Sequence, residues 1–147
     1  MSYRISPYNS IQEEIRDVIN EQNDKAIRTI NNMDISIDEQ IHDTRKRFKK
    51  IRAAILLIRH CIPKKTYKEL NILYRDLGRE LAPLRDGRVK VKNFNKLLKK
   101  HHNQLTVYRS FEEVLMVNYS KTQEVFEKND IPGRRYRLGS TGVTNSI

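Results

Sequence analysis

The sequence predicts an all-α protein, an antiparallel bundle of four to five helices. Proline and glycine are scarce among the 147 residues, with four and five copies. Two of the prolines and three of the glycines lie near the chain ends, which leaves the middle for long helices. Apolar residues recur there at three- and four-residue spacing, and no stretch shows the alternation of a strand.

The first helix is expected from about residue 10 to residue 30. Ser10 and Glu13, in the segment SIQE, have the spacing of a capping box. The segment NNMD then ends the helix. Its apolar stripe consists of Ile11, Ile15, Val18, Ile19, Ile27 and Ile30.

The second helix is expected from about residue 37 to residue 62. Ser36 and Glu39 form a second capping-box pattern. Pro63 ends the helix, because the residue before a proline avoids the helical region. One face of this helix is apolar and carries Ile37, Ile41, Phe48, Ile51, Ile55 and Ile62.

Three further helices are expected, over about 65–81, from near Pro83 to the segment KKHHN, and from Ser110 to about residue 128. Proline suits a first helical turn, and Ser110 has the sequence context of a third capping box. The inward residues of these helices are Leu70, Leu73, Tyr74, Leu77, Leu84, Val91, Phe94, Leu97, Leu98, Phe111, Leu115 and Phe126.

The length fits one helical domain over residues 1–130, followed by a flexible C-terminal tail over residues 131–147. The tail is polar and glycine-rich and has no period of either kind. The predicted core of the domain is Ile15, Ile41, Phe48, Ile51, Ile55, Leu73, Leu77, Val91, Phe94 and Leu98.

The composition indicates an anionic partner. Lysine and arginine total 29 against 18 acidic residues, so the net charge is +11, an excess that repels itself in a compact chain. The first residues lack the apolar region of a signal peptide, and the longest apolar run, residues 53–58, is too short to span a bilayer. We therefore expect no membrane partner and a cytoplasmic location. The single cysteine, Cys61, cannot form an internal disulfide and is expected to be buried.

The basic residues form stripes on three consecutive helices. A stripe with few acids at four-residue spacing is less typical of an ordinary solvated surface, where opposite charges offset each other. Arginine in particular suits phosphate, because its planar fork contacts two oxygens at once. The stripes are His42, Arg45, Lys46, Lys49 and Arg52 on the second helix, Lys64, Lys68, Arg75 and Arg79 on the third, and Arg85, Arg88, Lys92, Lys96 and Lys99 on the fourth.

The segment IHDTRKRFKKIRAAILLIR resembles the signature helix of the CHAD domain, the conserved histidine α-helical domain. That signature has a histidine, an arginine three residues later, a basic cluster and an apolar end; here His42 and Arg45 open it. A second segment, LYRDLGRELAPLRDGRV, resembles a junction between two helices of the family through Leu77-Gly78 and Arg85-Asp86. The resemblance covers about residues 36–98.

The resemblance implies a helical domain that binds inorganic polyphosphate, with polyphosphate granules as a further location. The expected polyphosphate-binding residues are His42, Arg45, Lys46, Lys49, Arg52, Arg75, Arg79, Arg85, Arg88 and Lys92. Full-length members carry two halves, each with its own His-x-x-Arg helix, whereas this chain has one such helix. We therefore expect a single-signature or half-length member, and a homodimer that rebuilds the missing half.

Nucleic acid is the alternative partner, since a pI near 9.9 fits it. The chain has no tryptophan, and its tyrosines and phenylalanines fall mostly on apolar stripes, whereas single-strand binders stack bases on aromatic rings. No enzyme is expected, because clustered carboxylates and a phosphate-cradling glycine loop are both missing from the pattern. The histidines lack the spacing for joint metal ligation, so no metal and no cofactor are expected.

Overall fold

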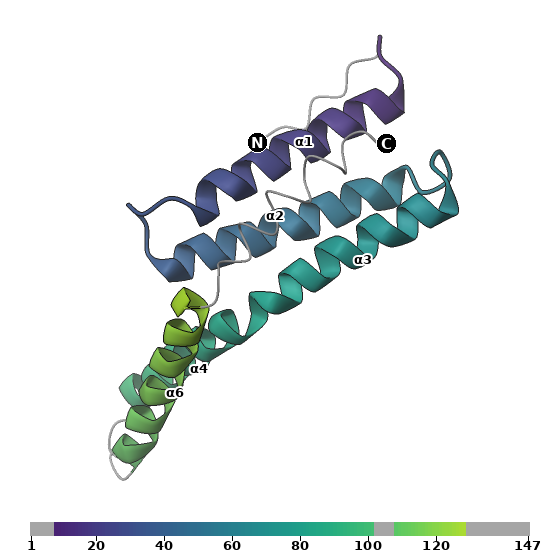
Figure 1. Cartoon of the computed structure of the whole chain (residues 1–147). Coiled ribbons are helices and arrows are strands. Elements are labelled where there is room, and N and C mark those ends of the chain that lie inside the picture. Colours follow the sequence, from purple (N-terminus) through teal and green to yellow (C-terminus); the bar gives the residue numbers. More distant parts are fainter. Residues whose placement is uncertain (1–7, 102–107, 129–147) are drawn as a thin grey trace. The chain divides into compact units, whose positions relative to one another are not determined.

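A computed structural model describes residues 8–101 and 108–128 of the chain (Figure 1). Within these ranges the chain forms five helices and no strand, so the predicted all-α class is confirmed. The helices divide into two compact units, the first ending at Glu80 and the second beginning at Leu81. One domain over residues 1–130 stays a prediction, and the predicted tail over residues 131–147 lies outside the described residues.

The first unit consists of α1 (Ile11–Ile30), α2 (Ile37–Leu57) and α3 (Lys64–Glu80). Consecutive helices run antiparallel, and α2 packs against both α1 and α3 (Figure 1). The buried apolar residues of this unit are Ile15, Ile19, Ala26, Ile30, Ile41, Phe48, Ile51, Ala54, Ile55, Ile58, Ile62, Leu70, Tyr74 and Leu77.

Both predicted N-caps of this unit are confirmed. The backbone N–H of Glu13 donates to Ser10 Oγ (3.3 Å), and the backbone N–H of Ser10 donates to Glu13 Oε2 (3.0 Å), which completes the capping box. At α2, the backbone N–H of Glu39 donates to Ser36 Oγ at 3.3 Å. These bonds satisfy donors that have no partner inside the helix.

The predicted end of α2 at residue 62 is wrong, because the helix stops at Leu57. Ile58 leaves the helical region with φ −99° and ψ 13°, and the Cys61 N–H donates to the Ile58 carbonyl at 2.8 Å. Ile58 and Ile62 turn inward and are buried, which leaves Cys61 on the outside. The predicted burial of Cys61 is therefore wrong as well.

The second unit pairs α4 (Ala82–Lys100) with α6 (Arg109–Lys128). Phe94 and Phe111 meet edge to face with 5.3 Å between ring centroids. Tyr119 is the buried residue of α6 and lies against Gly87, where an added Cβ would come within 3.1 Å of Tyr119 Cδ2. Because α6 begins at Arg109, Ser110 lies inside its first turn, and the third capping box is not formed.

The core prediction is confirmed at seven of its ten positions, and Leu73, Phe94 and Leu98 are half-buried instead. Ile11 and Phe111 are more exposed than predicted, at 58% and 50%. Two of the three half-buried residues lie on α4, where a two-helix unit buries only a narrow face. Helical periodicity identifies the inward side but not how far the neighbouring helix covers it.

A polar layer crosses the interior of the first unit. Gln22, Asn23 and Thr44 are 1%, 3% and 2% exposed. Arg47 Nη1 donates to Gln22 Oε1 at 3.2 Å, and the Tyr74 hydroxyl donates to Asn23 Oδ1 at 2.9 Å. We refer to Gln22, Asn23, Thr44, Arg47 and Tyr74 as the polar layer. Helical periodicity predicted only apolar inward residues on α1 and did not indicate this layer.

Candidate functional site

Four predicted binding residues follow one edge of α2. His42, Arg45, Lys49 and Arg52 succeed one another at intervals of three, four and three residues, which places them in a row on a 3.6-residue helix. His42 and Lys49 are exposed, whereas Arg45 and Arg52 are half-buried. We call His42, Arg45, Lys49 and Arg52 the α2 basic row. Lys46 is exposed and lies beside this row. The buried isoleucines on the adjoining face hold the row in place.

A groove runs between α2 and α3 at the C-terminal end of this row. The α2–α3 groove has a volume of about 260 Å³ and is formed by Lys49, Arg52, Ala53, Leu56, Tyr67 and Asn71. Arg52 Nε donates to Asn71 Oδ1 across the groove at 2.9 Å. This hydrogen bond orients the guanidinium, so less freedom is lost when an anion binds to it.

The predicted cations of α3, Arg75 and Arg79, are not among the residues that line the groove. Phe48 lies against Tyr74, with 6.0 Å between ring centroids, one turn from the contact of Arg52 with Asn71. Arg75 follows Asn71 by one helical turn, so it lies beyond the α3 edge of the groove. Arg45 on α2 is level with the turn that carries Arg75 and Arg79.

One acid is interposed among these cations. Asp76 Oδ1 lies 2.8 Å from Arg75 Nε and 3.7 Å from Arg79 Nη1. The hydrogen bond from Arg75, together with the charges of Arg75 and Arg79, holds the pKa of the Asp76 carboxyl below its ordinary value of 3.8. Arg75 and Arg79, the two predicted site arginines on α3, therefore share a carboxylate partner, which an incoming anion has to replace.

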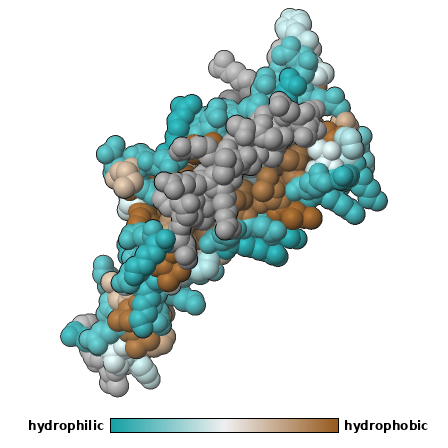
Figure 2. All heavy atoms as spheres, viewed as in Figure 1, coloured by the Kyte–Doolittle hydropathy of each residue, from teal (hydrophilic) through white to brown (hydrophobic). Residues whose placement is uncertain are grey.

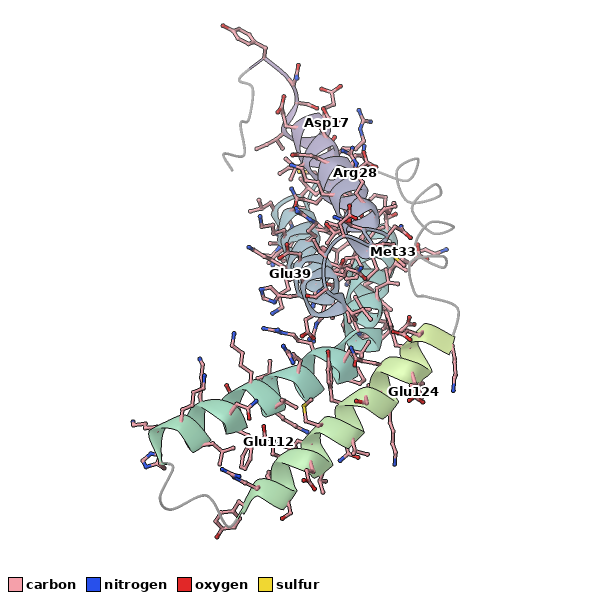
Figure 3. All side chains as sticks on the ribbon, turned by 90° about the vertical axis from the view of Figure 1, so that its left-hand side faces the viewer. Asp17, Arg28, Met33, Glu39, Glu112 and Glu124 are labelled. Carbon is pink, nitrogen blue, oxygen red and sulfur yellow. The ribbon has the colours of Figure 1, made fainter. Side chains whose placement is uncertain are left out.

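The α4 residues of the predicted site form a stripe within the second unit. Arg88 and Lys92 are exposed and Arg85 is half-buried. The guanidinium carbon of Arg88 lies 6.0 Å from the ring centroid of Tyr119, in the range of a cation–π contact. Side chains that end in nitrogen project from α4 along its length (Figure 3). The two units are described separately, so the convergence of this stripe with the α2 basic row stays a prediction.

Two groove residues, Tyr67 and Asn71, were missed by the sequence analysis. Neither carries a charge, whereas the predicted site was identified by its positive charges. Their four-residue spacing puts them on one edge of α3, and that spacing is the available signal. Tyr67 is half-buried, so an aromatic ring lies beside two cations of the predicted site.

Within the described ranges, no three histidine, cysteine, aspartate or glutamate side chains gather closely enough to hold a metal ion. His60 Nε2 instead accepts a hydrogen bond from Arg59 Nε at 2.8 Å. None of the helices in residues 8–101 and 108–128 combines the length and apolar character needed to cross a membrane.

Comparison with protein-family models matches residues 13–130 to the CHAD domain. This chain belongs to the CHAD-domain family. The match takes in most of α1 and all of α6, as well as the two segments that carried the resemblance. Searches of curated proteins and of solved structures found no match. The CHAD domain is associated with polyphosphate binding in general.

Proposed function

We propose that this CHAD-domain chain binds inorganic polyphosphate without cleaving it. The observation that carries the proposal is the α2 basic row beside the α2–α3 groove, in a chain of this family. Polyphosphate is a linear polyanion, and cations repeated along a groove match charges repeated along a chain. The binding residues proposed are those predicted from the sequence. Among them, Lys49 and Arg52 line the α2–α3 groove, the other residues of α2 and α3 lie outside its lining, and those of α4 add a second stripe.

Several cations acting together give the proposed site its affinity. A hydrogen bond to a charged group contributes about 1.5–3 kcal/mol net, so a few contacts offset the ordering of a flexible polymer. Affinity should fall steeply as salt is added, by analogy with nucleic-acid binders, because binding releases condensed counterions. No catalytic residue is proposed: Asp76, which lies beside Arg75 and Arg79, is paired with them.

The decisive experiment replaces Arg45, Lys49 and Arg85 together by glutamate. We expect polyphosphate binding to be lost with helicity unchanged, because Lys49 is exposed, Arg45 and Arg85 are half-buried, and none of them belongs to the apolar core. A matched control replaces Arg28, Lys65 and Lys121 by glutamate, which makes the same change in net charge at exposed positions outside the proposed site. Equal binding by the triple variant and its parent would contradict the proposal, as would equal losses in both triple variants.

Nucleic acid is the second candidate ligand, and Tyr67 in the groove is the observation that favours it. Competition between polyphosphate, single-stranded DNA and duplex DNA, at matched phosphate and salt, separates the two. We expect polyphosphate to outcompete both nucleic acids, because the cations of the α2 basic row would bind phosphate oxygens and have no need of bases. A preference for either nucleic acid would reassign the basic stripes. If polyphosphate wins, the cytoplasm and its polyphosphate granules are the proposed location.

A further inference from the structure

The α2–α3 groove has two chemically different ends. Lys49, Arg52 and Asn71 are polar, whereas Ala53, Leu56 and Tyr67 offer methyl groups and an aromatic ring. Its volume of about 260 Å³ is far larger than a single phosphate group requires, since one water molecule takes up about 30 Å³ of liquid. It lies slightly below the range for small-molecule sites, about 300–1,000 Å³, and so suits only a small ligand.

The polar end suits one or two phosphate groups. Arg52 is half-buried and its guanidinium is oriented by the hydrogen bond to Asn71 Oδ1. Lys49 adds a second positive charge from the preceding turn of α2. A planar guanidinium and an ammonium together form a common arrangement for phosphate oxygens.

The apolar end serves no purpose for inorganic phosphate. Leu56 leaves 47% of its surface exposed and lines the groove together with the two cations. Tyr67 is half-buried and lines the same wall from α3. An apolar wall lowers the free energy of a ligand only when the ligand has apolar or aromatic surface to cover it.

We propose that the α2–α3 groove binds a nucleotide, with its phosphates on Lys49 and Arg52 and its base against Leu56 and Tyr67. The inference goes beyond the proposed function but uses two of the same cations, so nucleotide and polyphosphate compete for the groove. The ligand chemistry is an aromatic base joined to phosphate, either as a free nucleotide or within a nucleic-acid strand.

The test compares adenosine triphosphate with inorganic tripolyphosphate, which has the same number of phosphates but no base. Affinities are measured by calorimetry at fixed salt. We expect the parent to bind adenosine triphosphate more tightly. Leu56→Ala and Tyr67→Ala should each weaken this binding by about fivefold or more, the scale of one base–aromatic contact, and leave tripolyphosphate unchanged.

Leu57→Ala is the matched control, since Leu57 is the next residue of α2, is 74% exposed and does not line the groove. It should change neither affinity. A second arm of the experiment measures the binding of a short single-stranded oligonucleotide. If the oligonucleotide binds with the same dependence on Leu56 and adenosine triphosphate does not bind, the groove is assigned to a nucleic-acid strand and the free-nucleotide site is overturned.

The outcomes separate this inference from the proposed function. Equal affinities for adenosine triphosphate and tripolyphosphate, unchanged in Leu56→Ala, would overturn the inference and leave polyphosphate binding intact. Nucleotide binding that depends on Leu56, in a chain that does not bind long polyphosphate, would sustain the inference and overturn the proposed function. Leu56 is half-exposed, so its replacement does not endanger the fold in either case.

Discussion

At Asp76, one carboxylate meets two of the arginines proposed to bind polyphosphate. An acid in this place acts as an internal anion that competes with phosphate for Arg75 and Arg79. It raises the charge density that a ligand needs before it can displace the carboxylate. Weakly charged anions are thereby disfavoured, which is a form of selectivity.

Asp76→Asn should therefore strengthen polyphosphate binding, by roughly two- to fivefold, the scale of an exposed ion pair. Glu80→Gln is the matched control. It raises the net charge by the same unit on the same helix, and it leaves the carboxylate partner of Arg75 in place. A filter-binding titration of both variants measures the difference. Equal gains would attribute the effect to net charge and not to the position of Asp76.

The same carboxylate has a defined pH dependence. Because the folded-state pKa of Asp76 is below its ordinary value of 3.8, its contribution to stability is complete above that value. The contribution is lost as the pH falls through the folded-state pKa. Binding assays near neutral pH therefore act on a fully charged Asp76, and the gain in Asp76→Asn should not vary between pH 6 and pH 8.

Among the elements, α2 combines the core and the site. Phe48 is 3% exposed and packs on Tyr74 of α3, while the α2 basic row occupies the neighbouring edge. Phe48→Ala should lower the free energy of unfolding by about 3–5 kcal/mol, because it leaves a cavity between α2 and α3. Urea unfolding followed by circular dichroism measures the loss, and Leu57→Ala serves as the exposed control. An unchanged unfolding midpoint would contradict the burial of Phe48.

Two helical glycines allow a comparison between α3 and α4. A Cβ at Gly78 would meet nothing within 4 Å, so Gly78→Ala should raise the free energy of unfolding by roughly 0.5–1 kcal/mol through helix propensity. A Cβ at Gly87 would press on the buried ring of Tyr119, so Gly87→Ala should gain less or lose stability. Thermal unfolding of both variants measures the two changes in stability. Equal gains in stability would mean that the contact between α4 and α6 can accommodate an added methyl group.

Features that depend on residues close together in the sequence could be predicted, whereas features that depend on packing between helices could not. The caps at Ser10 and Ser36 could be predicted, because a cap involves residues three apart. The end of α2 could not, because it depends on where Ile58 finds a buried site. The spacing of Tyr67 and Asn71 places them on one edge of α3, but their position opposite Arg52 could not be predicted, because it depends on the register between two helices.

For the whole molecule, α6 leaves a strip of apolar side chains exposed. Val114, Val117 and Val125 are 52%, 51% and 57% exposed, and apolar surface is visible on the second unit in Figure 2. The helix also carries acids, among them Glu112 and Glu124 at its two ends (Figure 3), whereas α4 is strongly basic. A second copy, related by a twofold axis, could set its α4 bases against these acids and cover both strips.

We therefore expect a homodimer that uses the α6 strip. Light scattering after size exclusion, with and without polyphosphate, gives the mass. Replacing Val114 and Val117 together by asparagine should shift the mass to that of one chain, while Met33→Asn, at a position 91% exposed in the first unit, should not. A monomeric parent under both conditions would mean that a single copy works with an open groove.

The polar layer has a consequence for the distances between charges on the surface. Apolar side chains of packed helices tolerate a slide by one turn, about 5.4 Å, because one isoleucine can replace another. The bonds from Tyr74 to Asn23 and from Arg47 to Gln22 form at one offset only. A slide would strand these buried groups at a cost of about 1–3 kcal/mol each. The polar layer thereby fixes the register of α2 and α3. That register sets the distance between the cations of the two helices, and hence the spacing of phosphates along a polymer that these cations can match.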